Sequence, residues 1–300
     1  MPDKFIVSKN HNRTRFDRWF KEEILNLPNS LIQRLLRKNK IKVNNKRIKS
    51  SFRLTDGDEV SVFNLSNYKA TDLKKKIEYL PSAKEKSGFE KFVIHDDNDY
   101  IVINKPRGIA VQSGTNNLKN IIDTIKKTKY FNYTKPYIVH RLDKETTGIF
   151  VIAKNREYAQ FFTSLFRIRK IHKTYLAIVK GEVPKNLKKM EDFLEYFEKN
   201  KKIRLKATTF LKVLKSNNKY SLLELNPLTG RKHQLRKQLY MRGFPIIGDT
   251  KYHLGKNKKI KNQLMLLHSY KIKFMKNDKK LNYLAELDSQ FKKKIDLYFR

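Results

Sequence analysis

The chain of 300 residues contains no cysteine and only ten glycines. The lack of cysteine excludes disulfides, thiolate metal sites and any reaction that needs a cysteine nucleophile. None of the glycines forms a Gly-x-Gly-x-x-Gly or Walker-type loop, so no nucleotide-cofactor or methyl-donor site of those kinds is indicated. Long apolar runs are absent too, and the first ten residues, MPDKFIVSKN, lack the apolar core of a signal peptide. We therefore expect a cytoplasmic protein that does not associate with membranes.

Acidic residues are also in short supply. The chain has 29 Asp and Glu against 68 Lys and Arg, which gives a formal net charge of +39 and a pI near 10.1. The chain is rich in Lys, Asn and Ile together, a bias that an AT-rich genome produces without any binding function. Part of the positive excess therefore follows from composition alone. The remainder makes a polyanion, and above all nucleic acid, the expected partner.

A small α+β module is expected over residues 13–65. Apolar residues at helical spacing predict helices over residues 14–25 and 29–40. Two short alternating runs around Asn44-Asn45, and a strand after the turn Asp56-Gly57-Asp58, complete the pattern.

This module concentrates basic side chains on its second helix and the segment after it. They are Arg34, Arg37, Lys38, Lys40, Lys42, Lys46, Arg47 and Lys49. The module resembles the αL-type RNA-binding domain of a ribosomal small-subunit protein and of tyrosyl-tRNA synthetases. That resemblance implies that Arg34 and Arg37 bind RNA. The alternative is a solvated face in a lysine-rich chain.

A second domain is expected over residues 90–300, after a lysine-rich linker at residues 66–89. Its patterns predict a hairpin over residues 91–106 with Asp96, Asp97 and Asp99 in the turn, strands over 148–154, 173–181, 207–214 and 220–228, and helices over 156–166, 233–243 and 291–299. These elements indicate a mixed sheet with peripheral helices.

The segment HRLDKETTG, His140 to Gly148, comes directly before one of these strands. Turn-forming residues and Thr hydroxyls can hold its backbone in a fixed irregular shape, with the Asp143 carboxylate beside the guanidinium of Arg141. A carboxylate held in this way can be aimed at a substrate. From the residue types alone, an ordinary turn capped by Asp143 is the simpler interpretation.

Three further segments accompany it. Lys105-Pro106-Arg107-Gly108 follows a strand and predicts a turn. The strand after Lys173 carries Tyr175, whose ring would suit an extruded base, although packing in the core is the commoner fate of a strand Tyr. The segment TGRKHQLR, which contains Arg231 and Arg236, enters a helix and supplies cations near which a carboxylate stays ionised.

The four segments together, in this order, resemble the motifs of the RluA-type pseudouridine synthases, in particular the RluC-like branch that acts on large-subunit ribosomal RNA. Thr147 stands where that family usually has Ser. The resemblance implies an α+β fold with a mixed, largely antiparallel sheet, the pseudouridine synthase fold. It implies isomerisation of uridine in large-subunit rRNA or a ribosome assembly intermediate, without cofactor or metal.

The resemblance also implies the roles of individual residues. The catalytic residues would be Asp143, Tyr175 and Arg236, with Arg236 paired to Asp143. Substrate would be bound by Lys105, His140, Arg141, Arg231, Leu267 and, in the first module, by Arg34 and Arg37. Whether Asp143 attacks the sugar or removes a ribose proton stays open. A monomer is expected, because no coiled-coil heptads are present.

Three other functions remain to be weighed. A binding-only protein would not need Asp143, Tyr175 and Arg236 together. A metal-dependent nuclease would need clustered carboxylates, and Asp96, Asp97 and Asp99 are explained by a hairpin turn. An RNA base methyltransferase would need a donor-binding loop or, for uridine C5, a cysteine, and the sequence has neither.

Overall fold

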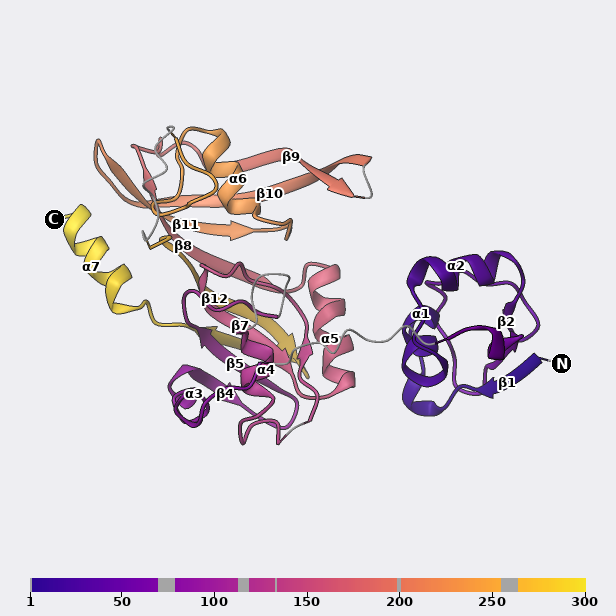
Figure 1. Cartoon of the computed structure of the whole chain (residues 1–300). Helices are drawn as coiled ribbons and strands as arrows, with labels where there is room; N and C mark the ends of the chain where they lie inside the picture. The colour runs from indigo at the N-terminus through magenta and orange to yellow at the C-terminus, as the bar shows by residue number, and fades with distance from the viewer. Residues whose placement is uncertain (1, 70–78, 113–118, 133, 199–200, 255–263) are drawn as a thin grey trace. The chain divides into compact units, whose positions relative to one another are not determined.

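The chain forms two compact units, residues 1–77 and 78–300, and the first has a hydrophobic core of its own. The computed structural model describes residues 2–69, 79–112, 119–132, 134–198, 201–254 and 264–300 (Figure 1). Among the helices of these ranges, none combines the length and the apolar character needed to cross a bilayer.

The first unit is a three-stranded antiparallel sheet covered by short helices. Its elements are β1 (Pro2–Ile6), α1 (Phe16–Trp19), the π-helical turn η2 (Phe20–Ile24), α2 (Asn29–Arg37), β2 (Ile41–Val43) and β3 (Glu59–Phe63), with the strands in the order β1-β3-β2. Phe16, Trp19 and Phe20 are almost completely buried and anchor its core. Helix α2 turns Ile32, Leu35 and Leu36 inward, which leaves its basic residues outside.

The unit differs from the expected pattern at two places. Strand β1 lies before the expected start at residue 13, because its backbone pairs with β3 from Pro2↔Phe63 to Ile6↔Glu59. After Asn44 and Asn45 the chain makes only an isolated bridge, and the expected second strand does not form. Both asparagines have a left-handed backbone (φ 47° and 62°), which closes a tight turn at once.

The second unit is built on one ten-stranded sheet. The strands are β4 (Val93–Asp96), β5 (Tyr100–Lys105), β6 (Tyr137–Ile138), β7 (Thr147–Ala153), β8 (His172–Lys180), β9 (Lys189–Glu198), β10 (Lys201–Ser216), β11 (Tyr220–Pro227), β12 (Leu267–Lys276) and β13 (Lys279–Leu284). The helices are α3 (Ala83–Ser87), α4 (Ile121–Ile125), α5 (Arg156–Arg167), α6 (Gln234–Met241) and α7 (Ser289–Tyr298).

Its sheet has the order β4-β5-β7-β12-β8-β11-β10-β9, with β13 beside β12 and β6 beside β7. Every pairing is antiparallel except that of β12 with β7. This confirms the predicted α+β class with a mixed, largely antiparallel sheet. The hairpin of β4 and β5 is also confirmed: Asp97 Oδ1 accepts hydrogen bonds from the backbone N–H groups of Asp99 and Tyr100, both at 2.8 Å.

Part of the expected linker at residues 66–89 belongs to the second unit, and residues 70–78 lie outside the described residues. Helix α3 begins with a capping box between Ser82 and Glu85. The hydroxyl of Tyr79 donates to Glu85, its backbone N–H donates to Asp123, and Phe89 is buried in the core. These contacts hold the segment from Tyr79 onward on the second unit.

The centre of the sheet positions the site. Strand β12 lies between β7 and β8, so that His268 is opposite Thr147 and Ser269 is opposite both Gly148 and Tyr175. Gly148 has φ +100°, and a Cβ there would lie 2.2 Å from the carbonyl oxygen of Ser269. Glycine is therefore required for β12 to approach β7 this closely.

Candidate active site

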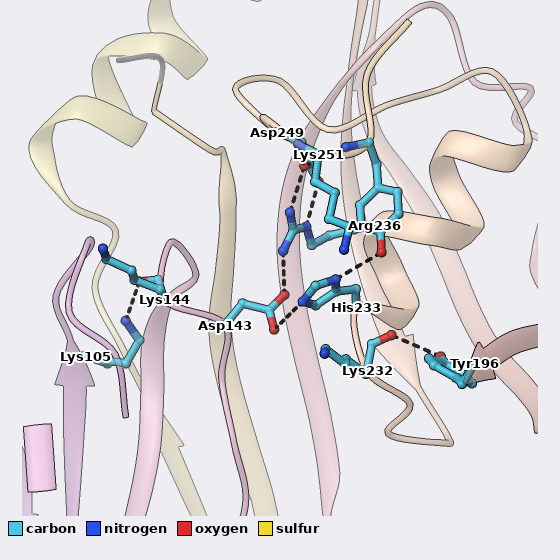
Figure 2. Close-up of polar contacts among 10 residues, drawn as sticks. Lys105, Asp143, Lys144, Tyr196, Lys232, His233, Arg236, Asp249 and Lys251 are labelled. Atoms are coloured by element: carbon cyan, nitrogen blue, oxygen red, sulfur yellow. Dashed lines mark hydrogen bonds and ion pairs between the residues drawn. The ribbon is translucent and has the colours of Figure 1, made fainter. Parts of the chain in front are cut away.

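Asp143 lies in the loop that leads into β7, and its backbone carbonyl closes a turn by accepting from Thr146 N–H at 3.1 Å. The loop is held by Lys105, whose Nζ donates to the carbonyl oxygens of Pro106, Ile109 and Lys144, each at 2.9 Å. Figure 2 shows the bond to Lys144. The turn predicted from HRLDKETTG is therefore fixed at the residue after Asp143.

Lys105 thus has a place different from the substrate contact that the resemblance implies. Its side chain is completely buried, and three backbone carbonyls take up its three N–H groups. Burial lowers the pKa of Lys105 to about 7. We assign this lysine to the support of the Asp143 loop, since no exposed donor is left for a ligand.

The carboxylate of Asp143 is oriented by Arg236, which donates from Nη1 to Oδ2 at 2.9 Å. Arg236 is itself gripped by Asp249, which accepts from Nε at 2.7 Å and from Nη2 at 2.8 Å (Figure 2). Burial would lower the pKa of Arg236, but the hydrogen bonds to the two carboxylates outweigh it and raise the pKa. The guanidinium is a permanent cation shared by two acids.

Asp249 is placed by a tight turn. Its side chain is fully buried and also accepts from the backbone N–H groups of Lys251 and Tyr252, at 2.9 and 3.0 Å. Burial alone would raise the pKa of Asp249, but Arg236 and these N–H groups lower it. The preceding Gly248 has φ +77°, and a Cβ there would lie 2.0 Å from the carbonyl oxygen of Leu264.

The second oxygen of Asp143 faces His233. Nε2 of His233 is 3.6 Å from Oδ1, too long for a hydrogen bond, and Nδ1 is 3.0 Å from the hydroxyl of Tyr252. Burial has the larger effect on His233 and lowers its pKa, although the charge of Asp143 favours the protonated form of His233. Oδ1 is therefore the freer oxygen of the carboxylate, with a neutral imidazole beside it.

The loop that carries His233 into α6 is fixed by a buried glutamine. Gln234 Oε1 accepts from Thr229 Oγ1 at 2.7 Å and from Arg231 N–H at 3.0 Å, and its Nε2 donates to Thr209 Oγ1 at 3.0 Å. His233 itself has a left-handed backbone, φ 54°. These bonds set the start of α6, and therefore the direction of Arg236 in its first turn.

Tyr175 and Leu267 reach the same place from adjacent strands. Tyr175 is half-buried in β8, and Leu267 opens β12 with only 3% of its surface exposed. Burial raises the pKa of Tyr175 to about 12, with a smaller contribution from the charge of Asp143. The hydroxyl of Tyr175 therefore keeps its proton at neutral pH.

These residues line a cavity of about 610 Å³, and a neighbouring cavity of about 520 Å³ shares Asp143, His233 and Arg236 with it. The larger cavity has seven basic residues in its lining: Arg141, Arg167, Arg169, Lys173, Arg231, Lys232 and Arg236. Asp143 is the one acidic residue of that described lining. A single carboxylate in a strongly positive cavity suits a reaction on a polyanion.

The remaining predicted residues fall into three groups. Arg141 is exposed at the rim of both cavities, and Arg231 lines the larger one while its Nε donates to the carbonyl of Lys206 at 3.1 Å. His140 lines the wall but stacks on Phe166, and its Nε2 accepts from Val151 N–H at 2.9 Å, so this nitrogen has no place for a ligand. Arg34 and Arg37 belong to the first unit.

Sequence reasoning gave Asp249 and Lys173 no role of their own. In the sequence, Asp249 after Gly248 is sufficiently explained as a turn residue. Its second role, as a partner of Arg236, appears only in the structure. Lys173 lines the larger cavity, and burial lowers its pKa to about 8. Within the described residues, no group of three or more His, Cys, Asp and Glu side chains is arranged to hold a metal ion.

The arrangement provides a carboxylate with one oxygen fixed and the other open, a protonated tyrosine hydroxyl, and cations that can hold phosphates. Such a carboxylate can act as a nucleophile or as a base. An aromatic ring and an apolar side chain in the wall suit a base taken out of its stack.

Comparisons with known proteins agree with this chemistry. The family model described as RNA pseudouridylate synthase matches residues 99–240. A ribosomal large subunit pseudouridine synthase C of Buchnera aphidicola subsp. Baizongia pistaciae is 31% identical over 301 residues, covering 95% of this chain and 94% of that protein. The protein of the same name from Rickettsia bellii is 34% identical over 298 residues, with 93% and 96% covered.

A solved structure supports the assignment. Human RNA Pseudouridylate Synthase Domain Containing 4 is 26% identical to the chain, with a TM-score of 0.59 over 70% of this chain and 94% of that one. The chain therefore belongs to the RNA pseudouridylate synthase family, whose reaction is the isomerisation of uridine to pseudouridine in RNA.

Proposed function

We propose that the chain isomerises specific uridines in large-subunit ribosomal RNA, free or in a ribosome assembly intermediate. The relatives from Buchnera and Rickettsia are named for the large ribosomal subunit, and they align with more than nine-tenths of this chain. The proposal is carried by the larger cavity, in whose described lining Asp143 is the one acid among seven basic residues.

Asp143 would act on the ribose of the target uridine. The reaction breaks the bond from uracil N1 to the sugar, turns the base and rejoins it through C5. Arg236 holds Oδ2, so Oδ1 is the oxygen we assign to the reaction. It would either attack C1′ or remove a ribose proton, and either path needs a carboxylate fixed in one orientation.

Tyr175 would stack on the base and carry a proton between two of its atoms. The high pKa keeps the proton on the hydroxyl, which would donate it to N1 as the uracil leaves; the phenolate would then accept the proton that C5 loses, which restores the hydroxyl. Leu267 would cover the base from β12, and the cavity arginines, with Arg141 and Arg231 foremost, would bind the phosphates on either side.

The first unit would bind RNA without reading its sequence. Arg34 and Arg37 are exposed on α2, and residues 24–55 contain no acidic residue that could neutralise this surface. We therefore propose that residues 13–65 form the core of an αL-type RNA-binding domain, and that residues 90–300 form the catalytic domain. A monomer in the cytoplasm, working without cofactor, completes the proposal.

One experiment tests it. Pseudouridine would be mapped by carbodiimide modification and reverse transcription on large-subunit rRNA, in a strain that lacks the gene and carries either the wild type or Asp143→Asn. Sites that appear with the wild type and vanish with Asp143→Asn establish the substrate and the catalytic residue together. Binding of the wild type to rRNA without any modification would favour a binding-only protein.

A further inference from the structure

The hairpin of β9 and β10 exposes aromatic rings on one face. Phe197, Phe193 and Phe210 have 80%, 58% and 47% of their surface exposed. The opposite face packs inward: Leu194 is buried, and Tyr196 donates from its hydroxyl to the carbonyl of Lys232 at 3.0 Å. In Figure 1 the hairpin reaches past helix α6. We call the exposed side the outer face.

The strand register arranges the outer face in regular rows. Each phenylalanine lies opposite a lysine, in the pairs Phe197↔Lys202, Phe193↔Lys206 and Phe210↔Lys189. The rows between them contain Glu195 opposite Arg204 and Glu191 opposite Thr208. Successive rings are four residues apart along the hairpin, about 13 Å for an extended strand.

Basic residues outnumber the acids on this face. Glu191 pairs with Lys189 at 2.9 Å and with Lys206 at 2.5 Å, and Glu195 pairs with Lys202 at 2.8 Å. Arg204 also approaches Glu195, at 3.7 Å. Two carboxylates are thus shared by four cations, and the outer face keeps an excess of positive charge.

This pattern distinguishes between kinds of partner. The core of a protein–protein interface is contiguous and poor in Lys and Glu. Here charged rows separate every ring from the next. Cations also lie against the rings, with the Arg204 guanidinium 5.8 Å from the centre of Phe193 and Lys189 Nζ 6.0 Å from that of Phe210.

We propose that the outer face binds unpaired nucleotides of the RNA substrate. Bases stack on Phe197 and Phe193, while Lys202 and Lys206 contact the phosphates, as single-stranded nucleic acid is held on aromatic and basic surfaces in general. The proposal rests on the RNA substrate of the proposed function and adds a second contact region, joined to the cavity wall through Tyr196 and Lys232.

The test measures binding in the full chain carrying Asp143→Asn, so that no turnover occurs. The probes are a labelled oligouridylate of about twelve nucleotides, within the range of such sites, and an RNA duplex of equal length. Phe193→Leu with Phe197→Leu keeps apolar surface and loses the rings. Phe193→Tyr with Phe197→Tyr keeps the rings and is the matched control.

We expect the leucine pair to weaken oligouridylate binding by about fivefold per ring and to change duplex binding by less than about twofold. The tyrosine pair should bind both probes like the parent. Unchanged oligouridylate binding by the leucine pair would overturn the proposal. So would sedimentation showing that the parent is a dimer and the leucine pair a monomer, because the face would then join two copies. Failure of the proposed function is read separately, from rRNA modification by the chain with Asp143 intact.

Discussion

The link between Asp249 and the carboxylate of Asp143 gives the sharpest prediction. Replacing Asp249 with Asn keeps the size of the side chain and one acceptor oxygen, but removes the charge that grips Nε and Nη2 of Arg236. Asp249 does not touch the cavity, since Arg236 lies between it and Asp143. Any loss of activity must therefore pass through the groups that Asp249 holds, of which Arg236 is the one bonded to Asp143.

The structure sets the size of the effect. Removing one partner of a buried ion pair costs about 3–5 kcal/mol of stability, and Asp143 remains to offset part of the cost, so we expect about 3 kcal/mol. A reacting group displaced by about 1 Å loses about 100-fold in rate, equivalent to about 2.7 kcal/mol of barrier. We therefore expect Asp249→Asn to lower kcat about 100-fold with little change in KM.

The assay is release of tritium from C5-labelled uridine in transcribed large-subunit rRNA, normalised to the folded fraction measured by urea unfolding. Asp192→Asn is the matched control. Asp192 accepts from Arg242 at 2.9 Å in a partly buried ion pair, and neither residue lines the two cavities that contain Asp143. It should lose stability and keep its rate per folded molecule.

The reasoning fails if Asp249→Asn is as active per folded molecule as the wild type. It also fails if Asp249→Asn and Asp192→Asn lose activity equally, because a general loss of structure would then explain both. A rise in KM at constant kcat would place Asp249 in substrate binding instead.

Three further results are expected. Tyr175→Phe keeps the ring but loses the hydroxyl, whose proton is retained at neutral pH because burial raises its pKa. Single-turnover assays should show product formation about 100-fold slower or more, with RNA affinity unchanged. Equal rates would show that the hydroxyl takes no part in the reaction. Arg34→Ala with Arg37→Ala should reduce the salt dependence of rRNA binding by about 0.7–0.9 per lost phosphate contact, and an unchanged slope in a salt titration would exclude RNA from α2. His268 is fully buried, and burial lowers its pKa to about 4. Below its ordinary pKa of about 6.5, His268 is therefore protonated in the unfolded chain while it stays neutral in the folded chain. Between about pH 6.5 and about pH 4, this residue should lower the free energy of unfolding by about 1.4 kcal/mol per pH unit as the pH falls. Urea unfolding of His268→Gln across this range should lack that contribution, and an unchanged slope would contradict the assignment.

The sequence alone predicted the class of the protein and singled out Asp143, because four segments in a fixed order resemble the motifs of one family. The turn of HRLDKETTG, the strand containing Tyr175 and the helix start in TGRKHQLR are local patterns, and local patterns decide strands, turns and helix starts. Charge composition pointed to nucleic acid without any fold, because net charge is additive over the chain. These features could be predicted because each depends on neighbouring residues.

Only the tertiary structure decided which further groups join the pair of Asp143 and Arg236 that the resemblance implied. Asp249 reaches Arg236 from the turn at Gly248, and the pairing of β12 between β7 and β8 fixes the strand that follows Asp143. The turn itself is a local pattern, but the contact between Asp249 and Arg236 is not. The same holds for Lys105, whose burial against three carbonyls gives it a supporting role where its motif implied a substrate contact. The free energy of these contacts comes from residues far apart in the chain, so no short stretch of sequence specifies them.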